Sequence, residues 1–200
     1  MIKLNLSSAE LKTIHNTDFF AVKASAAKKI DHLLAEARDE IKKVIEKNKF
    51  AFPDGVDAST GKIFRGENYS GLPYLVLDYP KYFSKESVFA FRTMFWWGNF
   101  FSCTMHLQGR ALEEHRGLLI HDLNSLKNKN IYVCVNSDPW QYHYQKSNYL
   151  PVDKLSGPEL KKLLCEKEFL KFSRKIPIKD YKKLAQFAAE SFLYLYPAKR

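Results

Sequence analysis

The side chains best suited to chemistry are Asp78 and His106. An aspartate beside a histidine can orient a general base or contribute to a metal site. Both lie in apolar, strand-like stretches, Asp78 in LPYLVLDY (72–79) and His106 in FFSCTMHL (100–107). They are the candidate catalytic residues, if any reaction occurs. The alternative is that Asp78 caps the turn before Pro80 and that His106 ends a strand near solvent.

The partners of His106 depend on a hairpin. Two aromatic-rich runs over 88–107 are joined by Gly98-Asn99, a signal for a two-residue turn. With that dipeptide as the whole loop, Thr93 faces Thr104 and His106 lies further along the same face. This face mixes aromatic rings with hydroxyl and imidazole groups. The hairpin therefore predicts one dry face and one mixed face, and the mixed face could line a pocket.

The stretch 72–79 extends the mixed face, because its leucines should join the buried side of the sheet. Tyr74 and Asp78 would then lie beside His106. Arg92 falls on the predicted dry face, where a guanidinium must be paired or carry a large desolvation penalty. Its predicted partner is a carboxylate such as Glu113 or Glu114, an anionic ligand, or solvent at the sheet edge. The predicted ligand-binding residues are Tyr74, Arg92, Thr93, Thr104 and His106.

Two other patterns do not support a site. Residues 113–122 hold acidic side chains with His115 and His121, but six residues put two helical side chains on nearly opposite sides. A helical metal site needs a spacing of three or four. Gly55 to Gly61-Lys62 differs from a phosphate-binding loop in its glycine spacing and in having Ile63 where Ser or Thr binds magnesium. No metal and no cofactor are predicted.

The charge balance suggests a second class of function. The chain holds 32 basic and 22 acidic residues, which gives a net charge of +10. Residues 151–200 hold 12 of the basic and 6 of the acidic residues. A basic face can attract nucleic acid, although lysines also simply solvate helices. The nucleic-acid alternative uses basic residues of the predicted C-terminal helices, namely Lys161, Lys162, Lys171, Arg174, Lys175, Lys182 and Lys183. A third reading is a protein–protein adaptor that uses the mixed face.

Cysteine usage and hydropathy indicate the cellular compartment of the chain and whether it enters a membrane. Cys103, Cys134 and Cys165 are odd in number and far apart, so they indicate neither a disulfide framework nor a zinc ribbon. Free thiols in apolar segments suit a reducing compartment, and a cytoplasmic location is predicted. The uncharged run 93–109 is shorter than a membrane-spanning helix and contains a turn signal. The N-terminus lacks the apolar region of a signal peptide, so no membrane association is predicted.

The elements that must position these residues can be read from caps and periodicity. Two S-x-x-E boxes, at Ser7 and Ser156, predict helix starts. Helices are predicted over 17–48, 110–127, 158–172 and 177–196, and strands over 72–79, 88–97, 100–107 and 131–135, with a further short strand at 140–144. This order predicts one α+β domain: helical over 7–48, a mainly antiparallel sheet of four to five strands over 60–150, and helical over 157–196. The best-supported function is the binding of a small anionic or aromatic molecule on the mixed face.

Overall fold

The computed structural model describes residues 5–197. Within them, seven strands form one antiparallel sheet in the order β1-β2-β3-β4-β7-β5-β6. The strands are β1 (Lys62–Tyr69), β2 (Leu72–Phe83), β3 (Ser87–Trp96), β4 (Phe100–Gly109), β5 (Tyr132–Cys134), β6 (Tyr149–Pro151) and β7 (Phe169–Pro177). The helices are α1 (Ser8–Ile14), α2 (Thr17–Asn48), α3 (Arg110–His121), α4 (Gly157–Glu166) and α5 (Leu184–Leu195), with 3-10 turns at Leu123–Leu126, Val152–Lys154 and Ile178–Lys183. The predicted α+β class is confirmed.

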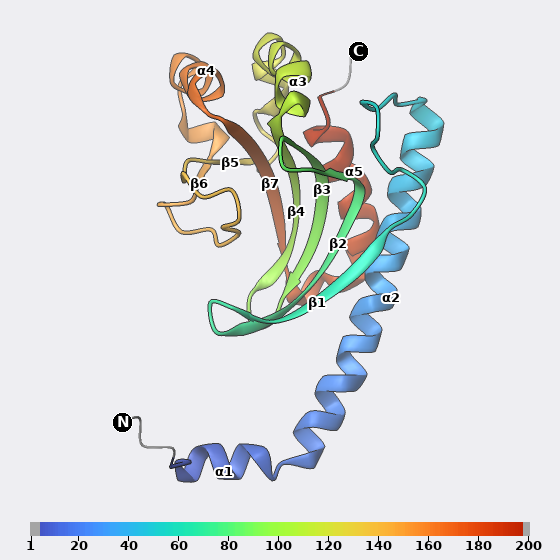
Figure 1. Cartoon of the computed structure of the whole chain (residues 1–200), viewed down its shortest axis with the longest axis vertical. Helices are drawn as coiled ribbons and strands as arrows, with labels where there is room; N and C mark the ends of the chain where they lie inside the picture. The colour runs from blue at the N-terminus through green and yellow to red at the C-terminus, as the bar shows by residue number, and fades with distance from the viewer. Residues whose placement is uncertain (1–4, 198–200) are drawn as a thin grey trace.

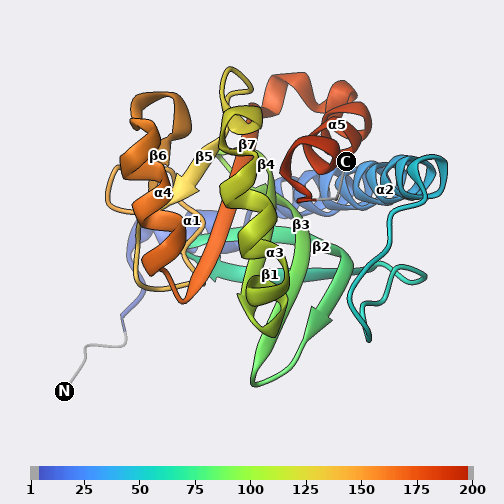
Figure 2. The same ribbon diagram turned by 90° about the horizontal axis from the view of Figure 1, so that it is seen from above.

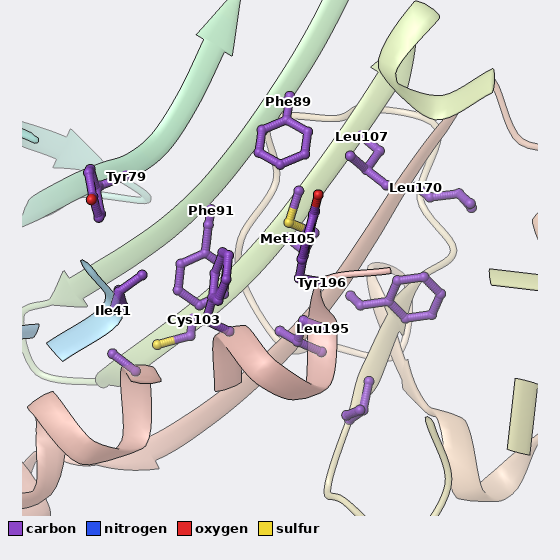
Figure 3. Close-up of a cluster of buried hydrophobic side chains, with 14 of the residues drawn as sticks. Ile41, Tyr79, Phe89, Phe91, Cys103, Met105, Leu107, Leu170, Leu195 and Tyr196 are labelled. Atoms are coloured by element: carbon purple, nitrogen blue, oxygen red, sulfur yellow. The ribbon is translucent and has the colours of Figure 1, made fainter. Parts of the chain in front are cut away.

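The hydrophobic core lies between one face of the sheet and two helices. Figures 1 and 2 show α2 and α5 side by side over this face. Buried residues of α2, from Leu34 to Ile45, recur every three or four positions, which keeps them on one side of the helix. Figure 3 shows Ile41 of α2 and Leu195 of α5 around the sheet residue Phe91. The helices thus cover the sheet face from which the phenylalanines of β3 project.

The hairpin between β3 and β4 differs from the prediction by one residue. Its loop spans 97–99, so Trp96 pairs with Phe100 and Arg92 pairs with Thr104. Thr93 pairs with Cys103 on the helix-covered face. The predicted pairing of Thr93 with Thr104 is therefore wrong. A slip of one residue transfers a whole set of side chains to the other face of a sheet. Here it moves Arg92 to the mixed face and Thr93 to the core.

Other element boundaries also differ. Strand β2 was expected to end at Pro80, but it continues to Phe83 with an irregularity in register between Asp78 and Lys81. The helix predicted over 158–172 ends at Glu166, and β7 begins at Phe169. The helix predicted over 110–127 ends at His121, and the one predicted from 177 begins as a 3-10 turn. Residues 140–144 form no strand.

The predicted caps are present. Ser7 and Ser156 each accept from the backbone N–H of the glutamate three residues later, and that glutamate accepts from the serine N–H. Helix α2 begins and ends at the predicted residues. Among the described residues, no helix is both long and apolar enough to cross a membrane.

Candidate functional site

The sheet face opposite α2 and α5 gathers polar groups from four strands. Cross-strand pairing places Asp78, Arg92, Thr104 and Ser173 in one row across β2, β3, β4 and β7. The neighbouring row runs from Lys81 through Ala90 and His106 to Lys171. Neighbouring rows on one face lie within reach of long side chains. The arrangement therefore concentrates ionisable groups at the centre of this face.

Asp78 and Arg92 form a two-pronged ion pair. The Nε and Nη2 atoms of Arg92 each lie 2.8 Å from an Asp78 carboxylate oxygen. The Asp78 side chain is 4% exposed and that of Arg92 is 17% exposed. The predicted partners Glu113 and Glu114 instead pair with arginines of their own helix α3. Arg92 is thus held by a carboxylate of the adjacent strand, at the position that the corrected hairpin register gives it.

His106 is buried without a hydrogen bond. Its ring lies 5.4 Å from the ring of Trp140 and 6.0 Å from that of Phe169, measured between centroids. Neither ring nitrogen has a hydrogen-bond partner among the described residues. Burial, together with the positive charges of Lys171 and Arg92, lowers the pKa of His106 to about 3, against a weak opposing contribution from Gln108. The imidazole is therefore neutral near pH 7, and Asp78 is paired with Arg92 and not with His106.

Lys171 is a fully buried cation. Its Nζ donates to the backbone oxygen of Gln141 at 2.5 Å and lies 4.5 Å from the centre of the Tyr142 ring. It forms no ion pair with a carboxylate of the described residues. Burial lowers its pKa to about 8, and Arg92 contributes further repulsion. Lys171 and Arg92 therefore both lie against the Tyr142 ring, where Asp78 pairs with Arg92 and Asp138 partly offsets the charge of Lys171.

A loop covers the part of this face over β4 and β7. The loop, residues 135–148, joins β5 to β6 and lies away from α2 in Figure 1. The hydroxyl of Tyr69, at the end of β1, accepts from the backbone N–H groups of Tyr142 and His143 at 2.6 and 2.9 Å. The Tyr142 ring lies 4.9 Å from the Arg92 guanidinium carbon. Tyr142 consequently separates Arg92 from Lys171 and closes this half of the face.

The other half, over β1 to β3, is open. It forms a hollow of about 430 Å³, a volume typical of small-molecule sites. Its lining residues are Phe64, Arg65, Tyr74, Val76, Asp78, Lys81, Phe83 and Arg92. Val76 and Asp78 are buried, whereas the rings of Phe64 and Phe83 are 44% and 42% exposed. The hollow therefore combines two accessible aromatic rings with the Asp78–Arg92 pair and with Lys81, which also lies 3.6 Å from Asp57.

A second hollow, of about 470 Å³, borders His115, Tyr196 and the end of α2. The His115 Nδ1 atom is satisfied by the backbone oxygen of Ala111 at 2.8 Å. The hollow also adjoins Pro197, next to residues 198–200, which lie outside the described range. It brings together fewer ionisable groups than the open sheet face, so we place the candidate site on the sheet.

The structure brings together most of the predicted site residues. Tyr74, Asp78, Arg92, Thr104 and His106 share the mixed face. Tyr74, Asp78 and Arg92 line the hollow, whereas His106 lies under the loop and the Thr104 hydroxyl lies 2.7 Å from that of Ser173. Thr93 is on the opposite face and contacts Cys103, at 3.8 Å between Oγ1 and Sγ.

Sequence reasoning missed Phe64, Lys81, Tyr142 and Lys171 as members of the mixed face. Lys171 was assigned to a helix, yet FLKFSRKIP (169–177) alternates apolar and polar side chains over most of its length, which is the pattern of a strand. That alternation indicates a strand with Lys171 on one of its faces.

The residues of the nucleic-acid alternative do not form one surface. Lys161 and Lys162 are exposed on α4, whereas Lys171, Arg174 and Lys175 lie on β7. Lys171 is buried on the mixed face, and Arg174 is buried on the opposite face, where its Nη1 lies 2.9 Å from Glu190 of α5. Lys182 and Lys183 belong to the 3-10 turn before α5. The seven residues therefore divide among three elements and two sheet faces.

Metal binding finds no support in the described residues. Among residues 5–197, no group of three or more His, Cys, Asp or Glu side chains is placed to hold an ion. Comparison of the chain with models of protein families, with curated proteins and with solved structures found no match.

Proposed function

We propose that this chain binds a small molecule with an anionic group and a flat apolar part in the open hollow over β1 to β3. The observation that carries the proposal is the excess positive charge on the mixed face. Lys171 is buried with no ion-pair partner among the described residues, although Asp138 partly offsets its charge, and the ion-pair partner of Arg92 is Asp78. An unneutralised buried charge is costly. A bound anion beside Arg92 would offset the repulsion between Arg92 and Lys171.

The hollow offers contacts for both parts of such a molecule. The guanidinium has five N–H donors, and the bonds to Asp78 use two of them. Lys81 adds a second cation to the lining. The rings of Phe64 and Phe83 provide exposed apolar surface on which a flat ligand can lie. This division favours a ligand whose anionic group meets Arg92 or Lys81 and whose rings contact Phe64 or Phe83.

The proposal is for binding without a reaction. The candidate general base, His106, lies beneath Trp140 rather than in the lining of the hollow. Asp78 is occupied by Arg92. His106 cannot take a proton from a ligand in the hollow unless the loop moves, and Asp78 cannot do so unless it leaves Arg92, because a general base must come within hydrogen-bond reach of that proton.

The proposal can be tested with two matched fluorescent probes. Anilinonaphthalenesulfonate carries an aromatic system and a sulfonate, and N-phenylnaphthylamine has the same rings without the charge. We expect saturable binding of the sulfonate, at least about tenfold tighter than that of the neutral probe, since charge-assisted contacts contribute on the order of 1.5–3 kcal/mol.

Two variants and their controls assign the binding to the hollow. Lys81→Met should weaken binding of the sulfonate more than that of the neutral probe, and Phe64→Ser should weaken both. The matched controls are Lys161→Met, an exposed lysine on α4, and Leu193→Ser, an exposed apolar residue on α5. Equal affinity for the two probes, or equal losses in variants and controls, would contradict the proposal.

A further inference from the structure

The N-terminal part of the described chain forms an arm that the body does not cover. The arm, defined as residues 5–22, comprises α1 and the first six residues of α2, and Figure 1 shows it extending beyond the sheet. Every residue of the arm is exposed. Its large apolar side chains are Leu6, Leu11, Ile14, Phe19, Phe20 and Val22. Such a concentration of exposed apolar residues marks an interaction surface.

In the α2 part of the arm, the apolar face continues the face that packs in the core. Along α2, helical spacing leads from the buried Leu34 through Ile30 to Phe19 and Phe20. Contact with the body starts near Lys23, whose Nζ lies 2.9 Å from the carboxylate of Glu67 on β1. The row of apolar side chains along α2 thus extends beyond the part of the helix that packs on the sheet. The surplus part lies on the arm.

The arm has little to stabilise it alone. Helix α1 has seven residues and none of them is buried. Isolated helices shorter than about 12–15 residues are marginal in water, and most helical stability in proteins comes from packing of an apolar face. The capping box at Ser7 stabilises the first turn but buries no apolar surface. The arm therefore needs a packing partner to hold its helices.

Charge limits what that partner can be. The arm holds one basic and two acidic residues, whereas the other 182 residues hold 31 and 20, a net charge of +11. A helix that binds an anionic membrane is rich in Lys and Arg on its polar face, and nucleic acid demands the same. The arm satisfies neither requirement. Two bodies of net charge +11 repel each other, but two arms that are nearly neutral do not.

We propose that two copies of this chain associate through their arms, with the apolar face of one arm packed on that of the other about a two-fold axis. An interface of this kind uses the same patch on both copies, so association stops at a dimer. A stable interface uses roughly 20–30 residues a side. Only the apolar face of the 18-residue arm makes this contact, so the adjoining turns of α2 must contribute to the interface as well. Because the arms extend beyond the bodies, association need not bring the positively charged surfaces together.

The test is the oligomeric state of the full chain, measured by sedimentation equilibrium over a range of concentrations. We expect a monomer–dimer equilibrium for the wild type. The double substitution Phe19→Glu and Phe20→Glu should raise the dimer dissociation constant about a hundredfold or more, because it places charge at two aromatic anchors. Amide exchange in α1 should slow as the wild-type concentration rises and should stay fast in this variant.

The matched control is Leu193→Glu, which adds charge at an exposed apolar residue of α5 outside the arm. It should leave the dimer dissociation constant unchanged. Thermal unfolding of all three proteins checks that the bodies remain folded, as expected for substitutions at exposed positions. A monomeric wild type, an unchanged dimer in the double variant, or an equal loss in the control would overturn the proposal. Arm-dependent binding to phosphatidylserine vesicles by a monomeric chain would also overturn it.

Discussion

The Asp78–Arg92 pair is the residue-level feature on which the candidate site depends. It is almost buried and joins two central strands by two hydrogen bonds. Removing one partner of a buried pair leaves an uncompensated charge, which costs about 3–5 kcal/mol. We expect Arg92→Met to lower the free energy of unfolding by that amount, and Asp78→Asn with Arg92→Met to recover part of the loss. Urea unfolding of the wild type, Asp78→Asn, Arg92→Met and the double variant measures the coupling, and purely additive losses would show that the pair contributes no specific interaction.

His106 should make stability depend on pH in the acidic range. Burial lowers the pKa of its imidazole to about 3 in the folded chain, whereas an unfolded histidine titrates near 6.5. As pH falls through about 6.5, the unfolded chain binds a proton that the folded chain does not, so stability is lost. Between about pH 7 and pH 5 we expect a loss of about 2 kcal/mol from this residue.

The control for this prediction is His106→Phe, which keeps a flat ring among Trp140 and Phe169 but has no titrating group. Denaturant unfolding of both proteins across that pH range isolates the contribution of His106. The variant should lose less stability than the wild type on acidification. Parallel pH profiles for the two proteins would show that the imidazole does not resist protonation in the folded state.

At the scale of elements, two glycines with positive φ have different consequences. Gly98 in the β3–β4 loop has φ +70°, and an added Cβ would lie no closer than 3.9 Å to Leu72. Gly109, between β4 and α3, has φ +59°, and its Cβ would lie 1.8 Å from the backbone oxygen of Glu86. Gly98→Ala should cost about 1 kcal/mol from conformation alone, and Gly109→Ala at least about 3 kcal/mol. Thermal and urea unfolding check this, and equal costs would contradict the close contact at Gly109.

The hairpin shows why the prediction of the site was only partly right. Gly98-Asn99 indicated a turn at the right place, but a three-residue loop replaces the two-residue one. Three-residue hairpin loops with glycine in a left-handed conformation are also common. The predicted register placed Arg92 in the dry core and Thr93 on the polar face. The opposite register, which the structure adopts, avoids burying a guanidinium among apolar side chains.

The missing strand β7 has a similar explanation. Leucines at 160, 163, 164 and 170 fit one helical stripe, and a single helix was therefore predicted over 158–172. The helix ends at Glu166, and the following residues alternate between the core and the mixed face. Long-range pairing with β4 determines this strand. The spacing of apolar residues cannot distinguish a helix from a strand where the two patterns overlap at a junction.

At the scale of the whole molecule, the fold class and the main helices were predictable because they follow from caps and amphipathic patterns. The strand order was not, because β7 inserts beside β4 from a distant part of the chain. The hollow depends on that order and on a loop without regular structure, so its location required the structure.

The net charge of +10 leads to a prediction about nucleic acid. If all seven residues contacted phosphates, a plot of log affinity for duplex DNA against log salt concentration would have a slope of about −6. Because the seven candidate residues lie on different faces and two of them are buried, we expect a much shallower slope. Filter binding at several salt concentrations measures it. A slope of about −6 that flattens in Lys182→Ala with Lys183→Ala would contradict the expectation.

The most direct test of the central claim is to locate a bound anion. A crystal structure of the full chain soaked with anilinonaphthalenesulfonate would show where an aromatic anion binds. We predict that the rings lie against Phe64 or Phe83, with the sulfonate about 2.7–3.2 Å from the donors of Arg92 or Lys81. An empty hollow, with the probe bound only along the arm or beside His115, would contradict the proposed function.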